Sequence, residues 1–413
     1  MDRNRRRYFT LLATDTVFFF ITMSVAGYDN VLPLFAAGLT RSTPLIGLVT
    51  AIALGLWVVP QLLLAGYVQR QPDKWQVMAW SLCGRLAMPA IALACFSPLA
   101  APPQRLLTVF LVLYSVYTLS DGVIVLALAD MLPRLLPERD RVRLFSLTQV
   151  ITGVLGLFAG GVVSWALGNS RWPYPRNYGV LLWIASGALL VSAVALLLLP
   201  RERHPASSTP LSTAYAQAWR DPRFRRMVAV QVLSSCVWLA VPYYGVHATT
   251  QLGLTNQIAG LFVIVSSLTY IAASLALGMI GRRKGVHAII RHGAVVVVTS
   301  PLIALAAEIW GGASPLVYAL VYVGIGVLNS LRMLGFRNYV FALAPEGAHP
   351  TYVGLANGLV GVTGLMPVLG GWLLAATSYR LVFALAAVCA AAGAALALSL
   401  PPATAPAEVT PAD

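Results

Sequence analysis

Charged side chains are scarce in this chain of 413 residues. Asp, Glu, Lys and Arg together make up 10% of it, whereas about a quarter of an ordinary soluble domain is charged. A chain of this length with so little charge cannot cover a water-exposed surface. Because apolar residues make up 58% of the chain, the composition predicts an integral membrane protein with several spans.

Signatures of chemistry are missing as well. The four cysteines, Cys83, Cys95, Cys236 and Cys389, lie in apolar stretches without paired or metal-ligand spacing, so they read as small buried side chains and not as disulfides. Neither a Gly-Lys-Ser/Thr phosphate loop nor a Gly-x-Ser-x-Gly motif occurs. We therefore expect no enzymatic activity, no cofactor, no bound metal and no ATP-driven pumping by the chain itself.

The sequence contains many long runs of apolar residues. A helix needs about 20 residues to cross roughly 30 Å of hydrocarbon, and two sets of six such runs can be placed in the sequence. They predict an all-α membrane protein of twelve transmembrane helices. The predicted spans are 9–36, 44–68, 75–97, 105–130, 144–167, 178–199, 227–249, 257–280, 286–308, 315–343, 351–375 and 380–400.

The second half of the chain repeats part of the first. Pro137, Glu138, Gly153 and Gly156 recur as Pro345, Glu346, Gly361 and Gly364 at a constant offset of half the chain. A period this long predicts two pseudo-symmetric six-helix bundles and not a solenoid, with a transport site between them. The predicted domains are 1–199, a linker at 200–226, a second bundle at 227–400 and a disordered Pro/Ala-rich tail at 401–413.

Basic residues set the predicted orientation. Most of the 28 lysines and arginines fall in the end segments and loops on the same side as the N-terminus, which the positive-inside rule places in the cytoplasm. The net charge of +14 is therefore a topology signal, and no nucleic-acid partner is expected. Both termini are expected in the cytoplasm, with the chain in the plasma membrane of the cell.

The linker contains one further pattern. Leu211, Tyr215 and Trp219 recur at i, i+4 and i+8 after Ser208-Thr209-Pro210, which predicts a short amphipathic helix on the inner membrane surface. A flexible connection is the alternative interpretation.

Several motifs resemble those of the major facilitator superfamily. The loop after the second span begins at Gly66, and its symmetric copy begins at Gly278; both are basic like that family's G-x-x-x-D-R-x-G loop. Arg70 and Arg282 stand where the family has an acid, so the charge network of this loop is expected to use other partners. Asp130, paired with Arg70 or Arg134, is one candidate for such an inner-gate contact.

The fifth and eleventh spans resemble the G-P-x-x-G-G pattern of the family's proton-driven exporters. Small residues let helix backbones approach closely, and proline frees a backbone carbonyl. The residues that carry the pattern are Gly156, Gly160 and Gly161 in one span and Pro367, Gly370 and Gly371 in the other. The resemblance implies a monomeric secondary transporter that moves a small molecule by alternating access, with proton-coupled efflux. Uptake of a metabolite, or a non-transporting sensor or assembly protein on the same scaffold, are the alternatives.

Ionisable groups within a membrane mark transport pathways or buried pairs. Asp121 and Arg85 lie at matched depths, roughly 13 and 15 Å from the inner ends of the fourth and third spans at 1.5 Å per residue. The matched depth predicts an ion pair between them. Its role is either structural, joining the two helices, or part of transport.

Other polar residues inside the spans are candidates for substrate or proton binding. Arg332 on the tenth span can bind an anionic group or exchange with Arg85 for Asp121; the alternative is an arginine that reaches the inner surface. Asn329 occupies the position symmetric to Asp121. Gln149 and Asn357 are symmetric amides that either line the pathway or bond neighbouring helices.

The first span carries two acids, Asp15 and Asp29. Asp29 suits proton coupling, although solvation near the outer interface explains it more simply. Asp15 is expected to lie at shallow depth on the inner side, either solvated or paired with an arginine of a loop. Tyr243, Tyr244 and His247 at the outer end of the seventh span are expected to contact substrate or to form an aromatic belt at the membrane interface.

Overall fold

The computed structural model describes residues 3–201, 219–344 and 349–403. These residues form helices joined by turns, without any β-strand. Twelve helical segments among them are long and apolar enough to cross a membrane. The predicted all-α class and the predicted number of spans are thereby confirmed. The amphipathic helix predicted before Trp219 and most of the predicted tail lie outside the described residues.

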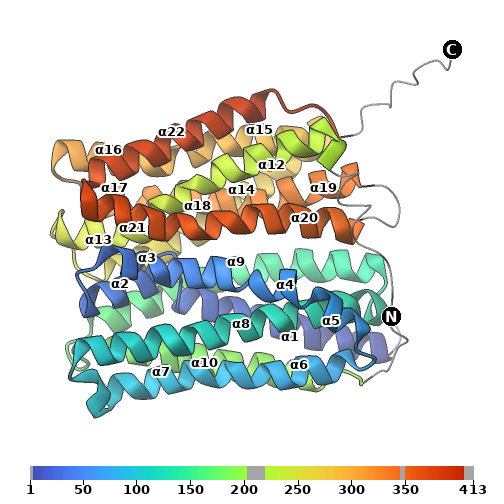
Figure 1. Ribbon diagram of the computed structural model, residues 1–413, viewed down its shortest axis with the longest axis horizontal. Coiled ribbons are helices and arrows are strands. Elements are labelled where there is room, and N and C mark those ends of the chain that lie inside the picture. The colour runs from blue at the N-terminus through green and yellow to red at the C-terminus, as the bar shows by residue number, and fades with distance from the viewer. Residues whose placement is uncertain (1–2, 202–218, 345–348, 404–413) are drawn as a thin grey trace.

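The first six spans form one bundle, in the lower half of Figure 1. Short π or 3-10 segments (η) interrupt several of its helices. In chain order the elements are α1 (Arg3–Val25), α2 (Val31–Leu39), α3 (Thr43–Ala51), η1 (Ile52–Leu56), α4 (Val59–Leu63), α5 (Ala65–Arg70), α6 (Lys74–Leu82), η2 (Cys83–Leu86), α7 (Ala87–Phe96), η3 (Pro98–Ala100), α8 (Pro103–Leu135), α9 (Glu138–Gly168) and α10 (Arg176–Leu197).

The other six spans form the second bundle, in the upper half of Figure 1. Its elements are α12 (Pro222–Ser235), η4 (Cys236–Leu239), α13 (Val241–Thr250), α14 (Ile258–Lys284), α15 (Val286–Val297), α16 (Thr299–Trp310), α17 (Pro315–Ala319), α18 (Val321–Ser330), η5 (Leu331–Phe336), α19 (Arg337–Leu343), α20 (His349–Gly361), η6 (Val362–Leu365), α21 (Met366–Ala376) and α22 (Tyr379–Leu398).

The first span is interrupted, and the prediction of one helix over 9–36 is wrong. The interruption lies between α1 and α2, where the Asn30 side chain accepts a hydrogen bond from the Val31 backbone N–H at 2.5 Å and caps α2. Gly27 makes room for it, since a Cβ there would lie 2.6 Å from Asn30 Oδ1 and 2.7 Å from Asp29 Oδ1. The prediction from hydrophobic residues assumed unbroken helix hydrogen bonds through this segment, whereas the Asn30 cap takes their place at the start of α2.

Both ends of the helical chain lie on the same side of the molecule (Figure 1), called the termini face below; the other side is called the opposite face. The two bundles meet where α3 packs on α21, α2 on α13 and α9 on α14. Near the termini face, α12, α19 and α20 make no extensive contact with the described part of the first bundle. The contact between the bundles is therefore concentrated toward the opposite face.

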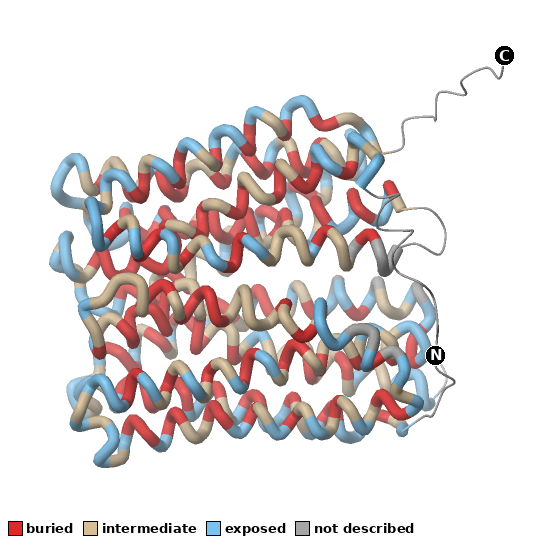
Figure 2. Tube along the Cα trace, in the orientation of Figure 1, coloured by how far each residue is buried: buried red, intermediate tan, exposed pale blue. Residues whose placement is uncertain are grey.

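The outer helices of both bundles carry many exposed apolar side chains. Figure 2 shows exposed positions along the helices at its upper and lower edges, and Trp80, Trp310 and Trp372 are among the large exposed side chains. Such a surface suits contact with lipid and not with water.

Candidate functional site

A glycine brings the third span close to the fourth. A Cβ at Gly84 in η2 would lie 1.9 Å from Ser120 Oγ on α8. Arg85 follows Gly84, and Asp121 follows Ser120. The close approach of the two backbones therefore places the guanidinium and the carboxylate within reach of each other.

Arg85 and Asp121 form a buried ion pair that belongs to a larger cluster. Arg85 Nη2 lies 3.0 Å from Asp121 Oδ1, and only 6% and 3% of the two residues are exposed. Arg85 Nη1 donates to Ser192 Oγ at 2.7 Å, and Ser192 Oγ donates to Asp15 Oδ1 at 2.5 Å. Four spans of the first bundle thus meet in one network, called the charge cluster below.

The charge cluster contains two carboxylates and one guanidinium. Asp121 has the direct ionic contact, whereas Asp15 Oδ1 lies 3.9 Å from Arg85 Nη1 and bonds a neutral hydroxyl. A second, uncompensated negative charge in the membrane interior is costly. The cluster is electrically balanced when one carboxylate holds a proton, and Asp15 is the less neutralised of the two.

The position of Asp15 corrects the sequence interpretation. Asp15 is not solvated near the inner interface, since it is only 9% exposed. The Asp15 carboxylate accepts its hydrogen bond from the Ser192 hydroxyl of α10, and not from water as the sequence interpretation assumed. Phe19, one turn along α1, lies with its ring centroid 5.7 Å from the Arg85 guanidinium carbon, so the arginine is also held by a cation–π contact.

Arg332 lies in η5, the π-helical segment that links α18 to α19. It is partly buried, and no acidic oxygen of the described residues lies within ion-pair distance of it. Its guanidinium interacts with the hydroxyl of Tyr28 from the first bundle. The Tyr28 ring lies 5.7 Å from the ring of Trp238. Arg332 therefore turns toward the other bundle and does not reach for the inner surface.

The interruption of the first span contacts both bundles through its backbone. Thr50 Oγ1 donates to the Tyr28 carbonyl at 2.6 Å, and Tyr322 Oη of the second bundle donates to the Asp29 carbonyl at 3.1 Å. The Asp29 side chain forms no ion pair with a described residue. Asp29 thus lies at the junction of the bundles, close to the Tyr28–Arg332 contact.

The remaining polar candidates differ in their surroundings. Gln149 Nε2 on α9 donates to Ser274 Oγ on α14 at 2.8 Å, so it joins the two bundles. Asn329 is partly buried on α18, and Asn357 is exposed on α20; neither has a hydrogen bond to a described side chain. The sequence symmetry of Gln149 and Asn357 is therefore not matched by equivalent contacts.

Glycines let α9 pack on α14. A Cβ at Gly156 would lie 2.2 Å from Ser267 Oγ, and one at Gly160 would lie 2.6 Å from the Gly260 carbonyl oxygen. Gly161, the next residue, has no neighbour within 4 Å of such a Cβ, so the packing expected of Gly161 is absent. The helix turns the adjacent glycine away from the interface, because successive residues lie about 100° apart.

The symmetric contact joins α3 to α21 near the opposite face. A Cβ at Gly371 would lie 2.6 Å from the Thr43 carbonyl oxygen of the first bundle, whereas one at Gly370 would lie 1.9 Å from the Leu239 carbonyl oxygen in η4 of the second bundle. Thr43 Oγ1 donates to the Gly371 carbonyl at 2.7 Å. Tyr243 Oη donates to the Pro367 carbonyl at 2.5 Å and lies 3.2 Å from that of Thr43.

Tyr243, Tyr244 and His247 are all buried, so the interpretation of the tyrosines as an interfacial aromatic belt is wrong. The signal for an internal position was the small-residue pattern of the eleventh span, against which Tyr243 packs.

The charged contacts of the loops at the termini face differ from those of the family's G-x-x-x-D-R-x-G loop. Gly66 and Arg70 lie in α5, and Arg282 is exposed near the end of α14. A Cβ at Gly278 would meet no described atom within 4 Å. The ion pairs among the described residues of these loops do not use Arg70 or Arg282: Asp130 Oδ1 lies 3.0 Å from Arg134 Nη2, and Asp73 Oδ2 lies 2.6 Å from Arg201 Nε.

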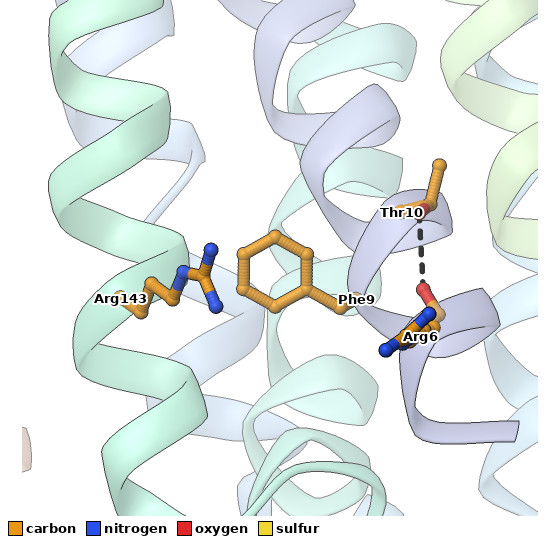
Figure 3. A pocket seen from close by; sticks show the side chains of 4 residues that line it. All are labelled: Arg6, Phe9, Thr10 and Arg143. Atoms are coloured by element: carbon orange, nitrogen blue, oxygen red, sulfur yellow. Dashed lines mark hydrogen bonds between the residues drawn. The ribbon is translucent and has the colours of Figure 1, made fainter. Parts of the chain in front are cut away.

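A hollow of about 430 Å³ opens at the termini face between α1 and α9. Figure 3 shows Phe9 between the side chains of Arg143 and Arg6, with Thr10 Oγ1 bonded to the Arg6 carbonyl at 3.0 Å. The Arg143 guanidinium carbon lies 5.9 Å from the Phe9 ring centroid. Arg6 and Arg143, which line the hollow, add to the positive charge of the termini face.

Sequence reasoning missed two parts of the polar interior. Ser192 gave no signal, since single serines are common in membrane helices. Glu308 was overlooked because it falls at the last residue of a predicted span, although the rule for intramembrane acids applies to it.

Solved structures with the same fold are transporters. A D-xylose–proton symporter aligns with a TM-score of 0.72 and 14% identity, over 97% of this chain and 99% of that chain. A bacterial homologue of the iron transporter ferroportin, in an inward-facing state, aligns with a TM-score of 0.67 and 13% identity over 98% and 100%. A POT family transporter in complex with 5-aminolevulinic acid aligns with a TM-score of 0.66 and 13% identity over 95% of each chain.

At identities this low, the structural likeness shows a shared fold alone. No curated protein sequence matches the chain significantly. The model of the Major Facilitator Superfamily, however, matches residues 15–365, which is most of the sequence. The chain therefore belongs to the major facilitator superfamily and is not an enzyme.

Proposed function

We propose that this protein is a secondary active transporter that moves a small molecule by alternating access between its two bundles. The observation that carries the proposal is the uneven contact between the bundles, which is extensive toward the opposite face and sparse near the termini face. An unevenly closed pair of pseudo-symmetric bundles is what one state of a rocking mechanism requires. The basic termini face is assigned to the cytoplasm, with the chain in the plasma membrane.

Proton coupling is proposed for the charge cluster. The cluster contains one more carboxylate than guanidinium, and it lies in spans that belong to a single bundle. A protonatable group enclosed in one moving body can take up a proton on one side of the membrane and release it on the other. Efflux is the proposed direction, supported by the glycine pattern of α9 and α21; metabolite uptake and a non-transporting role are the competing functions.

Proteoliposomes test the transport mechanism. We expect an imposed pH gradient to drive accumulation of a substrate, and Asp15→Asn to reduce this accumulation to near background because the amide cannot release a proton. Exchange of labelled for unlabelled substrate, which needs no net proton movement, should persist in the variant. Asp140→Asn, the same change in a residue at the termini face, should behave as wild type. Gradient-driven accumulation by Asp15→Asn at the wild-type rate would exclude this residue as the coupling site.

Arg332 is proposed to bind an anionic group of the substrate. The supporting observation is a guanidinium between the bundles without an acidic partner among the described residues, beside the aromatic pair of Tyr28 and Trp238. An amphiphilic organic anion would satisfy both the charge and the rings.

Substitutions at Arg332 test the substrate class. Arg332→Gln should weaken the binding of an anionic ligand about 10- to 100-fold, as expected for one charge-assisted hydrogen bond, and Arg332→Lys should weaken it less. Thermal-shift titration of the purified protein with a carboxylate and its amide analogue measures the difference. Equal loss of affinity for both analogues would point to an altered structure and against anion recognition.

A further inference from the structure

A second buried polar cluster lies in the second bundle near the opposite face. His247 on α13 is fully buried, with Nδ1 at 2.8 Å from Tyr318 Oη on α17 and Nε2 at 2.9 Å from Glu308 Oε2 on α16. Tyr318 Oη in turn donates to the Tyr244 carbonyl at 3.1 Å. The four residues are called the histidine cluster below.

The three hydrogen bonds of the histidine cluster require one hydrogen more than a neutral imidazole, a tyrosine hydroxyl and an ionised carboxylate supply. The three bonds need three hydrogens. A neutral imidazole supplies one, the Tyr318 hydroxyl supplies one, and an ionised Glu308 supplies none. All three bonds form together only when one more proton is bound, either on the imidazole or on the carboxylate. Without that proton, one of the bonds from α13 to its neighbours is lost.

The surroundings give this proton a route to solvent. The Glu308 side chain is 20% exposed, and Arg380 Nε, on a side chain that is 62% exposed, lies 3.6 Å from Glu308 Oε1. The rings of Tyr379 and Phe383 pack on the imidazole, with centroids 4.9 and 5.2 Å from the centroid of the His247 ring. The ionisable groups that face His247 directly or through Glu308 are Glu308, Arg380, Tyr318 and Tyr379. The exposed part of Glu308 is the route by which we expect the proton to exchange with solvent at the opposite face.

The same helix carries the contact between the bundles. Tyr243 precedes Tyr244 on α13, and its hydroxyl bonds the Pro367 carbonyl and reaches that of Thr43 in the first bundle. A change in how α13 is held by α16 and α17 therefore acts on the position of Tyr243. The helix is short, since it runs from Val241 to Thr250, so we expect a shift at His247 to be passed on to Tyr243.

We infer that the histidine cluster is a second proton-binding site, and that its bound proton stabilises closure of the opposite face through α13. Loss of the proton removes one restraint on α13 and favours opening. The inference rests on the alternating access proposed above, but it involves neither the charge cluster nor the substrate.

Distances between spin labels test it without any substrate. Labels at Arg171→Cys and Gly312→Cys, in a background without the native cysteines, report the separation of the bundles at the opposite face. In the parent protein the ratio of closed to open populations should fall about tenfold or more as the pH rises from about 5 to about 8. Glu308→Gln should stay closed over this range, because its amide donates to Nε2 without a titratable proton.

Two further variants complete the design. Tyr318→Phe, which removes the two of the three bonds that the Tyr318 hydroxyl makes, should be more open than the parent at about pH 5. Asp140→Asn, the same acid-to-amide type of change at the termini face, should keep the parent response. A pH response of Glu308→Gln equal to that of the parent would overturn the inference alone. One unchanging distance in every variant at every pH would overturn it together with alternating access.

Discussion

Replacing Arg85 with methionine is expected to lower the free energy of unfolding by about 3–5 kcal/mol, the range seen when one partner of a buried ion pair is removed. The reason is the Asp121 carboxylate, which would be left buried without the guanidinium that now lies 3.0 Å from it. Asp15 and Ser192 would lose a partner as well. Denaturant unfolding in detergent, followed by tryptophan fluorescence, measures the change.

Two double variants separate folding from transport. Arg85→Met with Asp121→Asn removes both charges and should recover most of the lost stability, since no unpaired charge remains at Asp121. Exchanging the two charges, with Arg85→Asp and Asp121→Arg, should recover folding if the pair acts only as a structural link. Recovered folding with absent proton-driven transport would instead assign the pair a part in coupling. An unchanged unfolding free energy in Arg85→Met alone would contradict the buried pair itself.

Replacing Gly160 with valine is expected to reduce transport by an order of magnitude or more, because it separates α9 from α14. A Cβ at this position would already lie 2.5 Å from Ile264 Cγ1 and 2.6 Å from the Gly260 carbonyl oxygen, and the two methyl groups of valine add to the overlap. Overpacking of this kind costs about 1–3 kcal/mol or more. Initial rates of transport in proteoliposomes, normalised to folded protein, measure the effect.

The adjacent glycine provides the matched control. Gly161→Val adds the same side chain to the same helix turn, where no atom lies within 4 Å, and it should transport at nearly the wild-type rate. Equal losses in the two variants would show that the backbone freedom of glycine in α9, and not contact between the bundles, limits transport. Equal wild-type activity would show that α9 and α14 need not approach closely.

The architecture was predictable because it depends on properties that the bilayer imposes on every residue. The hydrophobic runs gave the number of spans, and the 208-residue offset between Gly153 and Gly361 indicated the paired bundles. The interruption at residues 26–30 was not predictable from hydropathy, since it depends on a cap by Asn30 and on space at Gly27.

The polar interior was predictable only in part. Matched depth along two helices was enough to pair Arg85 with Asp121, because both lie far from either interface. Depth does not give rotation about a helix axis, so the burial of Asp15 and the bond from Ser192 were missed. The same limit separates Gly160 from Gly161: the motif gives the small residues, while the packing partner decides which of them is needed.

The hydrogen bonds that join the bundles near the opposite face share one property. Thr43, Tyr243, Tyr322 and Ser164 each donate a side-chain hydroxyl to a backbone carbonyl of the other bundle. Every amino acid has a backbone carbonyl, whatever its side chain. Substitutions at acceptor positions such as Asp29 or Gln257 therefore leave the acceptor atom in place. The closed state is thus held by neutral bonds that tolerate sequence drift on one side and are insensitive to ionic strength.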